Sequence, residues 1–166
     1  MPGTVIETRT AAQITEYTSL GADPSNPTLC KTKRGFSTGE FYYGRFSNNI
    51  SPDGLAALRQ GFADLLAGTR TQFTTRYETA ASGGNRFTYE DTWRRIGIET
   101  ITIAGQPIAA VAFERAQQNL GAIFQGTEKL WYDPSSGVWV KRTKTAGGET
   151  SQNFAIDWEV SKISVP

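Results

Sequence analysis

The residue types that carry most enzyme chemistry are scarce in this sequence. It has no histidine and one cysteine, Cys30, which excludes the usual triads, histidine acid–base catalysis and Cys or His zinc sites. We expect Cys30 to be a small buried side chain, because the flanking Lys31 and Lys33 supply charge but no base that would make a reactive thiol. The sequence contains no P-loop and no dinucleotide glycine fingerprint. We therefore expect no catalytic residue, no metal, no cofactor and no enzyme activity.

Carboxylate pairs are the remaining route to catalysis. Glu90 and Asp91 are adjacent, so in a strand their side chains point to opposite faces and cannot converge. Asp157 and Glu159 share a face, but they alternate with apolar residues, which is typical of a solvated strand face. A carboxylate-based hydrolase assembled from distant strands stays open as a third function.

Basic residues occur in three short groups, with tryptophans nearby in sequence. The groups are Lys31, Lys33 and Arg34; Arg94 and Arg95; and Lys141, Arg142 and Lys144. Stacking of bases on Trp93, Trp131 and Trp139 is conceivable, but 17 basic and 16 acidic residues leave a net charge of only +1. We expect no nucleic-acid partner. A solvated sheet face, whose Lys and Arg stems cover aromatic rings, explains the same residues.

The strongest structural signal is a β-hairpin from Ile123 to Lys144. Its strands are rich in β-branched and aromatic residues, and DPSSG has the residue types of a turn. A four-residue loop, 134–137, places Asp133 opposite Val138, Tyr132 beside Trp139 and Trp131 beside Val140. In this register, one face carries Leu130, Tyr132, Trp139 and Lys141, and the other carries Lys129, Trp131, Val138, Val140 and Arg142.

Aromatic residues on both faces of this hairpin suggest a ligand site. Phe124, Leu130, Tyr132 and Trp139 could line the concave side of a curved sheet and bind an apolar or glycan-like ligand. The alternative is that a helix fills the concavity and these residues are ordinary core.

One helix is predicted, from Ser51 to Ala67. Ser51 is a suitable N-cap, Pro52 fits the first helical position, and Gly68 closes the helix as a left-handed cap. Gly61 would permit close approach of a neighbouring strand. Burying the apolar stripe is worth on the order of 8–15 kcal/mol before entropy, so the helix should lie on a sheet. The stripe consists of Leu55, Leu58, Phe62, Leu65 and Leu66.

The rest of the chain is predicted to be short-linked strands that form an antiparallel meander. They are expected at 4–9, 13–20, 28–33, 37–46, 70–79, 86–96, 98–103, 107–118 and 152–163, with loops such as 21–27 between them. The fold class is therefore α+β and mostly β, a curved antiparallel half-barrel packed on one helix. We expect a single domain over 1–166, with N-terminal strands and loops (1–50), the helix (51–67) and the meander (69–166).

Two segments resemble a pattern of bacterial extracytoplasmic proteins. They are ETITIAGQPIAAVAFERAQ, Glu99–Gln117, and EKLWYDPSSGVWVKR, Glu128–Arg142. The C-terminal half of the chain is similar to uncharacterised lipoprotein-like domains whose sheet curls as a half-barrel, related in shape to the LolA and LolB lipoprotein carriers. The resemblance implies a periplasmic or envelope location and a curved sheet that holds something apolar. It brings no catalytic residue.

These observations favour a non-enzymatic extracytoplasmic binding or accessory protein, with a small apolar ligand or a protein as partner. The alternative is a structural subunit that docks on a larger assembly, or self-associates, through strand edges and aromatic surface. No run approaches the roughly 20 apolar residues of a membrane span. The N-terminus, MPGTVIETRT, lacks the pattern of a signal peptide. The sequence leaves the oligomeric state open.

Overall fold

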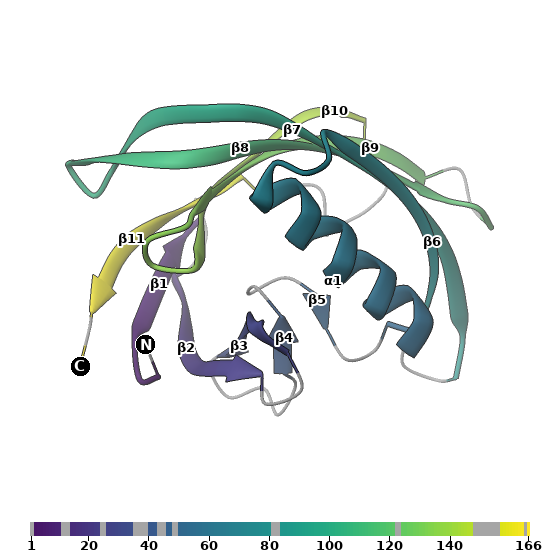
Figure 1. The fold of residues 1–166 in the computed structure, drawn as a ribbon, viewed down its shortest axis with the longest axis horizontal. Coiled ribbons are helices and arrows are strands. Elements are labelled where there is room, and N and C mark those ends of the chain that lie inside the picture. The colour runs from purple at the N-terminus through teal and green to yellow at the C-terminus, as the bar shows by residue number, and fades with distance from the viewer. Residues whose placement is uncertain are drawn as a thin grey trace.

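One long sheet and one helix make up the fold (Figure 1). The computed structural model describes residues 2–10, 14–23, 26–34, 40–42, 46–47, 50–80, 84–121, 124–147, 157–164 and 166. The elements within them are β1 (Val5–Arg9), β2 (Ile14–Asp23), β3 (Asn26–Arg34), β4 (Glu40–Tyr42), β5 (Phe46–Ser47), α1 (Pro52–Ala67), β6 (Gln72–Ala80), β7 (Arg86–Ile103), β8 (Gln106–Asn119), β9 (Phe124–Asp133), β10 (Val138–Gly147) and β11 (Trp158–Ser164).

The sheet is antiparallel and strongly curved. Its eleven described strands lie in the order β5-β4-β3-β2-β1-β11-β10-β9-β8-β7-β6, so the two halves of the chain join where β1 pairs with β11. The strands curl around α1, with β6 on one side of the helix and β2 to β5 on the other (Figure 1). This arrangement confirms the predicted α+β fold class.

Helix α1 begins and ends where the sequence predicts. Gly68 adopts the left-handed conformation with φ 73°. Ser51 does not use its side chain to cap the helix; its Oγ accepts a hydrogen bond from Glu78 N at 3.3 Å, and its N–H donates to Glu78 O at 2.7 Å. Ser51 thus fastens the start of the helix to β6. A Cβ on Gly61 would lie 2.6 Å from the ring of Phe73, which confirms that Gly61 permits the close approach of a strand.

The sheet has apolar clusters on both faces. The concave cluster consists of Leu55, Leu58, Phe62, Leu65, Phe73, Tyr77, Trp93, Val111, Phe113, Leu130, Tyr132 and Trp139. The outer cluster consists of Ile6, Ile103, Ala110, Ala112, Trp131, Val138, Val140 and Val160. Ile103 of β7 and Val160 of β11 share the outer cluster although β8, β9 and β10 separate their strands in the sheet. The far end of the β7–β8 hairpin therefore covers part of the outer face (Figure 1).

Several predicted boundaries need correction. Segments 86–96 and 98–103 are one strand, β7, with a register shift between Arg95 and Gly97; a β-bulge accommodates Gly97, at φ 151°, without ending the strand. The predicted loop 21–27 is shorter, because β2 runs to residue 23 and β3 starts at residue 26. The predicted strand 37–46 covers two short strands, β4 and the start of β5, which runs to residue 47. Residues 152–156 of the predicted last strand, and the side chain of Cys30, lie outside the described part.

The β9–β10 hairpin follows the predicted register only next to its turn. Val138 pairs with Asp133 and Trp139 with Tyr132, as predicted, but Trp131 pairs with Lys141 instead of Val140. A bulge at Val140 adds one residue to β10, and one extra residue exchanges the faces of everything that follows. Lys141 therefore lies on the outer face, with its Nζ 5.9 Å from the ring centroid of Trp131.

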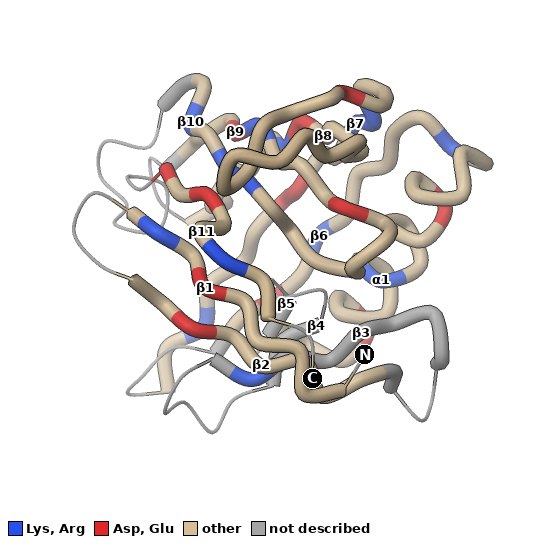
Figure 2. Tube along the Cα trace, turned by 90° about the vertical axis from the view of Figure 1, so that its left-hand side faces the viewer, with Lys and Arg blue, Asp and Glu red and all other residues tan. Residues whose placement is uncertain are grey.

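Charges of both signs are spread over the fold. Both β1 and β11 carry acidic and basic positions, and the neighbouring β2 carries acidic ones only (Figure 2). Within the part of the chain that the structure describes, no helix is long and apolar enough to cross a membrane.

Candidate functional site

Three of the four predicted ligand-binding residues lie on the concave face, beneath α1. Leu130, Tyr132 and Trp139 are buried, and the ring centroid of Phe62 lies 5.7 Å from that of Tyr132 and 5.0 Å from that of Trp139. The helix thus occupies the concavity at these residues, as in the alternative that the sequence left open. Phe124 begins β9, but its side chain lies outside the described part. Ligand binding by this set stays a prediction.

A buried polar network lies on the same face, next to the aromatic core. It crosses five neighbouring strands, β6 to β10. Its members are Tyr77, Asp91, Arg115, Gln117, Glu128 and Arg142, all buried. Tyr77 belongs to the concave cluster. Asp91, Arg115, Gln117 and Glu128 each lie two positions along the strand from a concave-face or network residue, so the sheet pleat directs them inward. Arg142 points inward because of the bulge at Val140.

The guanidinium of Arg115 lies at the centre of this network. Its Nε donates to Asp91 Oδ2 at 2.7 Å, its Nη1 to Glu128 Oε1 at 2.9 Å and its Nη2 to Tyr77 Oη at 3.2 Å. On the far side of Glu128, Arg142 Nε lies 2.6 Å from Oε2. Two guanidinium groups and two carboxylates therefore balance one another in a chain of alternating charge.

Gln117 and Tyr77 complete the network at its β6 end. Gln117 Nε2 donates to Asp91 Oδ1 at 2.8 Å and to Tyr77 Oη at 2.7 Å, and Tyr77 Oη donates to Asp91 Oδ2 at 3.2 Å. The cationic centre also contacts the aromatic core, because Arg115 Cζ lies 5.4 Å from the ring centroid of Trp93.

Burial and charge together fix the protonation states in this network. Burial raises the pKa of the Tyr77 hydroxyl, and the opposing attraction of Arg115 does not cancel that effect. For Arg115, burial disfavours the charged form, but the charges of Asp91 and Glu128 raise its pKa above the ordinary value. The tyrosine stays neutral and the guanidinium charged, which suits a network that holds strands together better than one that transfers protons.

Sequence reasoning missed this network. Asp91 was compared only with Glu90, and Arg142 was assigned to a solvated face; that assignment is wrong, because the bulge at Val140 turns Arg142 inward. One signal was available: Asp91 and Glu128 stand two positions from Trp93 and Leu130, in phase with the core pattern of their strands. Charged residues in phase with the core on neighbouring strands indicate a buried ion network.

Two predicted placements of carboxylates hold. Glu90 points away from Asp91 and pairs with Arg76 on the outer face, at 2.6 Å. Asp157 and Glu159 are exposed, as expected for a solvated face. Among the described residues, no group of three or more Cys, Asp or Glu side chains is placed to hold a metal ion.

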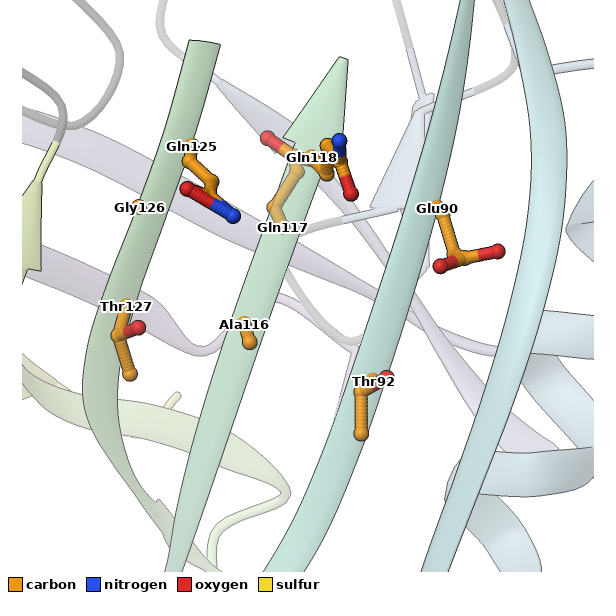
Figure 3. A pocket seen from close by; sticks show the side chains of 8 residues that line it. All are labelled: Glu90, Thr92, Ala116, Gln117, Gln118, Gln125, Gly126 and Thr127. Atoms are coloured by element: carbon orange, nitrogen blue, oxygen red, sulfur yellow. The ribbon is translucent and has the colours of Figure 1, made fainter. Parts of the chain in front are cut away.

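An open pocket of about 380 Å³ lies on the outer face of β7, β8 and β9 (Figure 3). Its lining consists of Glu90, Thr92, Ala116, Gln117, Gln118, Gln125, Gly126 and Thr127. Cross-strand pairing sets them in rows: Ala116 pairs with Thr92 and Thr127, and Gln118 pairs with Glu90 and Gln125. The short side chains of the Ala116 row form the floor, and the longer Gln118 row forms a wall.

A third polar cluster fastens the β7–β8 hairpin to the outer face. Glu99 accepts hydrogen bonds from Lys129 Nζ and from Trp131 Nε1, both at 2.8 Å. The hydrogen bond from Lys129, followed by that from Trp131, lowers the pKa of the Glu99 carboxyl. Lys129 Nζ and Lys141 Nζ lie 4.9 Å and 5.9 Å from the ring centroid of Trp131, so Lys141, a member of the predicted basic groups, lies over an aromatic ring.

The architecture, an open curved antiparallel sheet that holds one helix, is that of two solved bacterial proteins. The hypothetical lipoprotein YmcC from Escherichia coli (K12) aligns over 100% of this chain and 86% of its own, with a TM-score of 0.59 and 15% identity. A proposed lipoprotein from Parabacteroides distasonis ATCC 8503 aligns over 99% of this chain and 96% of its own, with a TM-score of 0.50 and 12% identity. At such identities the likeness concerns the fold alone. No family model and no curated protein matches the sequence.

Proposed function

We propose that this chain is a non-enzymatic extracytoplasmic protein that works by binding. The observation that carries the proposal is the contrast between its polar groups. Asp91 and Glu128, both with 0% exposure, are held by arginines inside the sheet. The open pocket on the outer face presents amides, hydroxyls and one carboxylate, Glu90, which Arg76 holds at 2.6 Å. Amides and hydroxyls form hydrogen bonds but are poor acids and bases near neutral pH.

The proposed location is the bacterial envelope. Both structural neighbours are described as lipoproteins, and an accessory role in the envelope fits a fold whose buried charged groups, Asp91, Arg115, Glu128 and Arg142, are paired with one another. A carrier function like that of LolA and LolB would place an apolar ligand on the concave face. Such a ligand would have to displace Phe62, whose side chain is fully buried among Tyr132 and Trp139.

Cell fractionation and mass spectrometry test this proposal. The native gene, with its own upstream sequence and a C-terminal tag, is expressed in its own host, and the tagged protein is expected in the envelope fraction. Native mass spectrometry of the purified protein, mixed with an excess of solubilised material from that fraction, should detect a bound ligand that stays chemically unchanged on incubation. Recovery from the cytosol, or conversion of the ligand by the wild type, would overturn the proposal, and conversion would favour the carboxylate hydrolase.

A second function, a subunit that docks or self-associates, is favoured by one observation. Ile98 is 69% exposed and Ile96 is 42% exposed, and both lie at the bulge of β7. Sedimentation velocity over a range of protein concentrations tests it. Growth of the sedimentation coefficient with concentration, abolished by Ile98→Ser, would support self-association, and a constant monomer value would remove that form of the idea.

A further inference from the structure

We propose that the outer-face pocket of β7–β9 binds a neutral, hydroxyl-rich chain, that is, a saccharide. The inference rests on the proposed binding function and names the ligand class and the site. It depends on three properties of the pocket. They are its shape, the charge balance of its rim, and the fact that the backbone groups of its strands are already hydrogen-bonded to neighbouring strands.

The shape follows from the lengths of side chains in successive cross-strand rows. The floor row, Thr92–Ala116–Thr127, continues onto β6 at Thr74, whose Oγ1 lies 2.9 Å from Thr92 Oγ1. Longer side chains flank it on both sides. One flanking row is Arg76–Glu90–Gln118–Gln125, and the other is Arg94–Glu114–Lys129. With neighbouring strands about 4.8 Å apart, the floor forms a trough that crosses four strands and is long enough for several linked units of a chain.

The rim of the trough is balanced in charge. Arg76 Nε lies 2.6 Å from Glu90 Oε2, and Arg94 Nη2 lies 3.1 Å from Glu114 Oε1. Lys129 Nζ lies 2.8 Å from Glu99 Oε1, so all three cations of the flanking rows have a carboxylate partner and leave no excess charge to attract an ion. Gln118 and Gln125, both exposed, each offer an amide donor and an amide acceptor. A ligand that matches this lining is uncharged and carries many groups that both donate and accept hydrogen bonds, as sugar hydroxyls do.

An extended peptide fits the trough less well. Sheets bind peptides mainly by adding a strand at a free edge, where backbone groups are unpaired. Strands β7, β8 and β9 each have a neighbour on both sides, so their backbones are engaged and only side chains are on offer. The trough also lacks the apolar side-chain pockets that give peptide binding its specificity, since Ala116 is the one apolar side chain in the described lining.

The lining also sets the expected affinity. None of the eight lining residues is aromatic, so stacking on a sugar face, worth about 1 kcal/mol or more where it occurs, is absent. We expect binding in the millimolar range, about 1 mM.

Nuclear magnetic resonance titration of the purified chain tests the inference. Cellohexaose, maltohexaose and chitohexaose are each added to the ¹⁵N-labelled protein up to about 10 mM, roughly ten times the expected Kd. At least one should shift the amide signals of residues 90–92, 116–118 and 125–127. Ala116→Gln, at an exposed position, fills the floor and should weaken binding by tenfold or more, as should Gln118→Ala combined with Gln125→Ala. Gln106→Ala, an exposed glutamine in the β7–β8 turn, is the matched control and should bind as the wild type does.

Three results would overturn the inference. They are no shift with any of the three sugars, shifts confined to concave-face residues, and wild-type binding by Ala116→Gln with an otherwise unchanged spectrum. Displacement of the sugar by a neutral glycine-serine peptide at equal concentration would reassign the trough to peptides. If the titration shows no binding at the trough, but the protein is recovered from the envelope and binds a ligand that it leaves unchanged, the proposed function stands. Only the assignment of this site is then lost.

Discussion

The two faces of β7 and β8 show how differently the same ion pair behaves inside and outside the sheet. On the concave face, Arg115 contacts Asp91 at 2.7 Å, with side-chain exposures of 9% and 0%. On the outer face, Arg94 contacts Glu114 at 3.1 Å, with exposures of 51% and 40%. The residues alternate along the same two strands, so they share strand geometry and differ mainly in solvation.

This difference teaches that burial decides the consequence of breaking a pair. A buried pair has already lost its hydration, so removal of one partner leaves an uncompensated charge in a poorly solvated site. An exposed pair exchanges its partner for water and loses little. The concave network is therefore structural in its energetics, and the exposed ion pairs of the outer face can be changed at little cost in stability.

The largest predicted effect breaks the concave network at its centre. Arg115→Met removes the donor shared by Asp91, Glu128 and Tyr77, and it should lower the free energy of unfolding by about 3–5 kcal/mol. Arg94→Met is the matched control on the outer face and should cost about 1 kcal/mol or less. Guanidinium denaturation followed by tryptophan fluorescence measures both. Equal losses for the two variants would contradict the distinction between the faces.

The next effect concerns packing beneath the helix. Gly61→Ala gains up to about 1 kcal/mol of helix propensity, but its Cβ would lie 2.6 Å from the Phe73 ring. Overpacking of this kind costs about 1–3 kcal/mol, so we expect a net loss of stability. Phe73→Leu should remove part of the clash, and the double variant should therefore be less destabilised than the sum of the single variants. A stabilised Gly61→Ala protein would show that α1 and β6 are more loosely packed.

The sequence predicts the helix and most of the strands in their order along the chain, although it divides β7 in two and joins β4 with β5. The Leu55–Leu58–Phe62–Leu65 stripe and Gly68 predict α1 to within a residue, and turn chemistry predicts the Asp133–Val138 pairing. The confirmed turn is held by hydrogen bonds: Ser135 N and Ser136 Oγ donate to the Asp133 carboxylate at 2.9 Å and 2.6 Å. Burial opposes this carboxylate, but the hydrogen bonds from Ser136 and Ser135 prevail and lower its pKa.

The candidate sites were beyond the sequence because they depend on register. A single extra residue, Val140, moves Arg142 from the outer to the concave face, and no local pattern announces that bulge. The outer trough arises because Ala116 aligns with Thr92 and Thr127 from strands far apart in sequence. Such rows exist only once the pairing of every strand is known.

A smaller effect on stability is expected at alkaline pH, from Tyr77 of the concave network. The pKa of Tyr77 is raised by burial in the folded protein from an ordinary value of 10.0. The contribution of its neutral hydroxyl is therefore complete below pH 10 and is lost as pH rises from there toward the folded pKa. Tyr77→Phe should be less stable than the wild type by about 1 kcal/mol at pH 7, and it should lose less stability between pH 9 and about 11. Chemical denaturation at each pH gives both numbers, and parallel pH curves would contradict the assignment.

The smallest effect lies on the outer face at acid pH, at the contact that holds the β7–β8 hairpin. Hydrogen bonds from Lys129 and Trp131 lower the pKa of Glu99 from 4.5, so this contact stabilises the folded state above that pH and is lost as pH falls through the lowered pKa. Glu99→Gln should be as stable as the wild type below the lowered pKa of Glu99 and slightly less stable above it. The difference is small because the side chains of Glu99 and Lys129 are about one-third exposed, at 33% and 31%, and water screens the pair.

Hydrogen exchange of the amides in the β7–β8 hairpin, at pH 7 and pH 3, measures this effect directly. In the wild type, exchange at residues 99–110, corrected for its intrinsic pH dependence, should quicken at the lower pH, whereas in Glu99→Gln it should already be quick at pH 7. Glu114→Gln, which breaks the neighbouring exposed pair, should leave this hairpin unchanged; if it quickened exchange as much as Glu99→Gln, the whole outer face and not the Glu99 contact would be holding the hairpin in place.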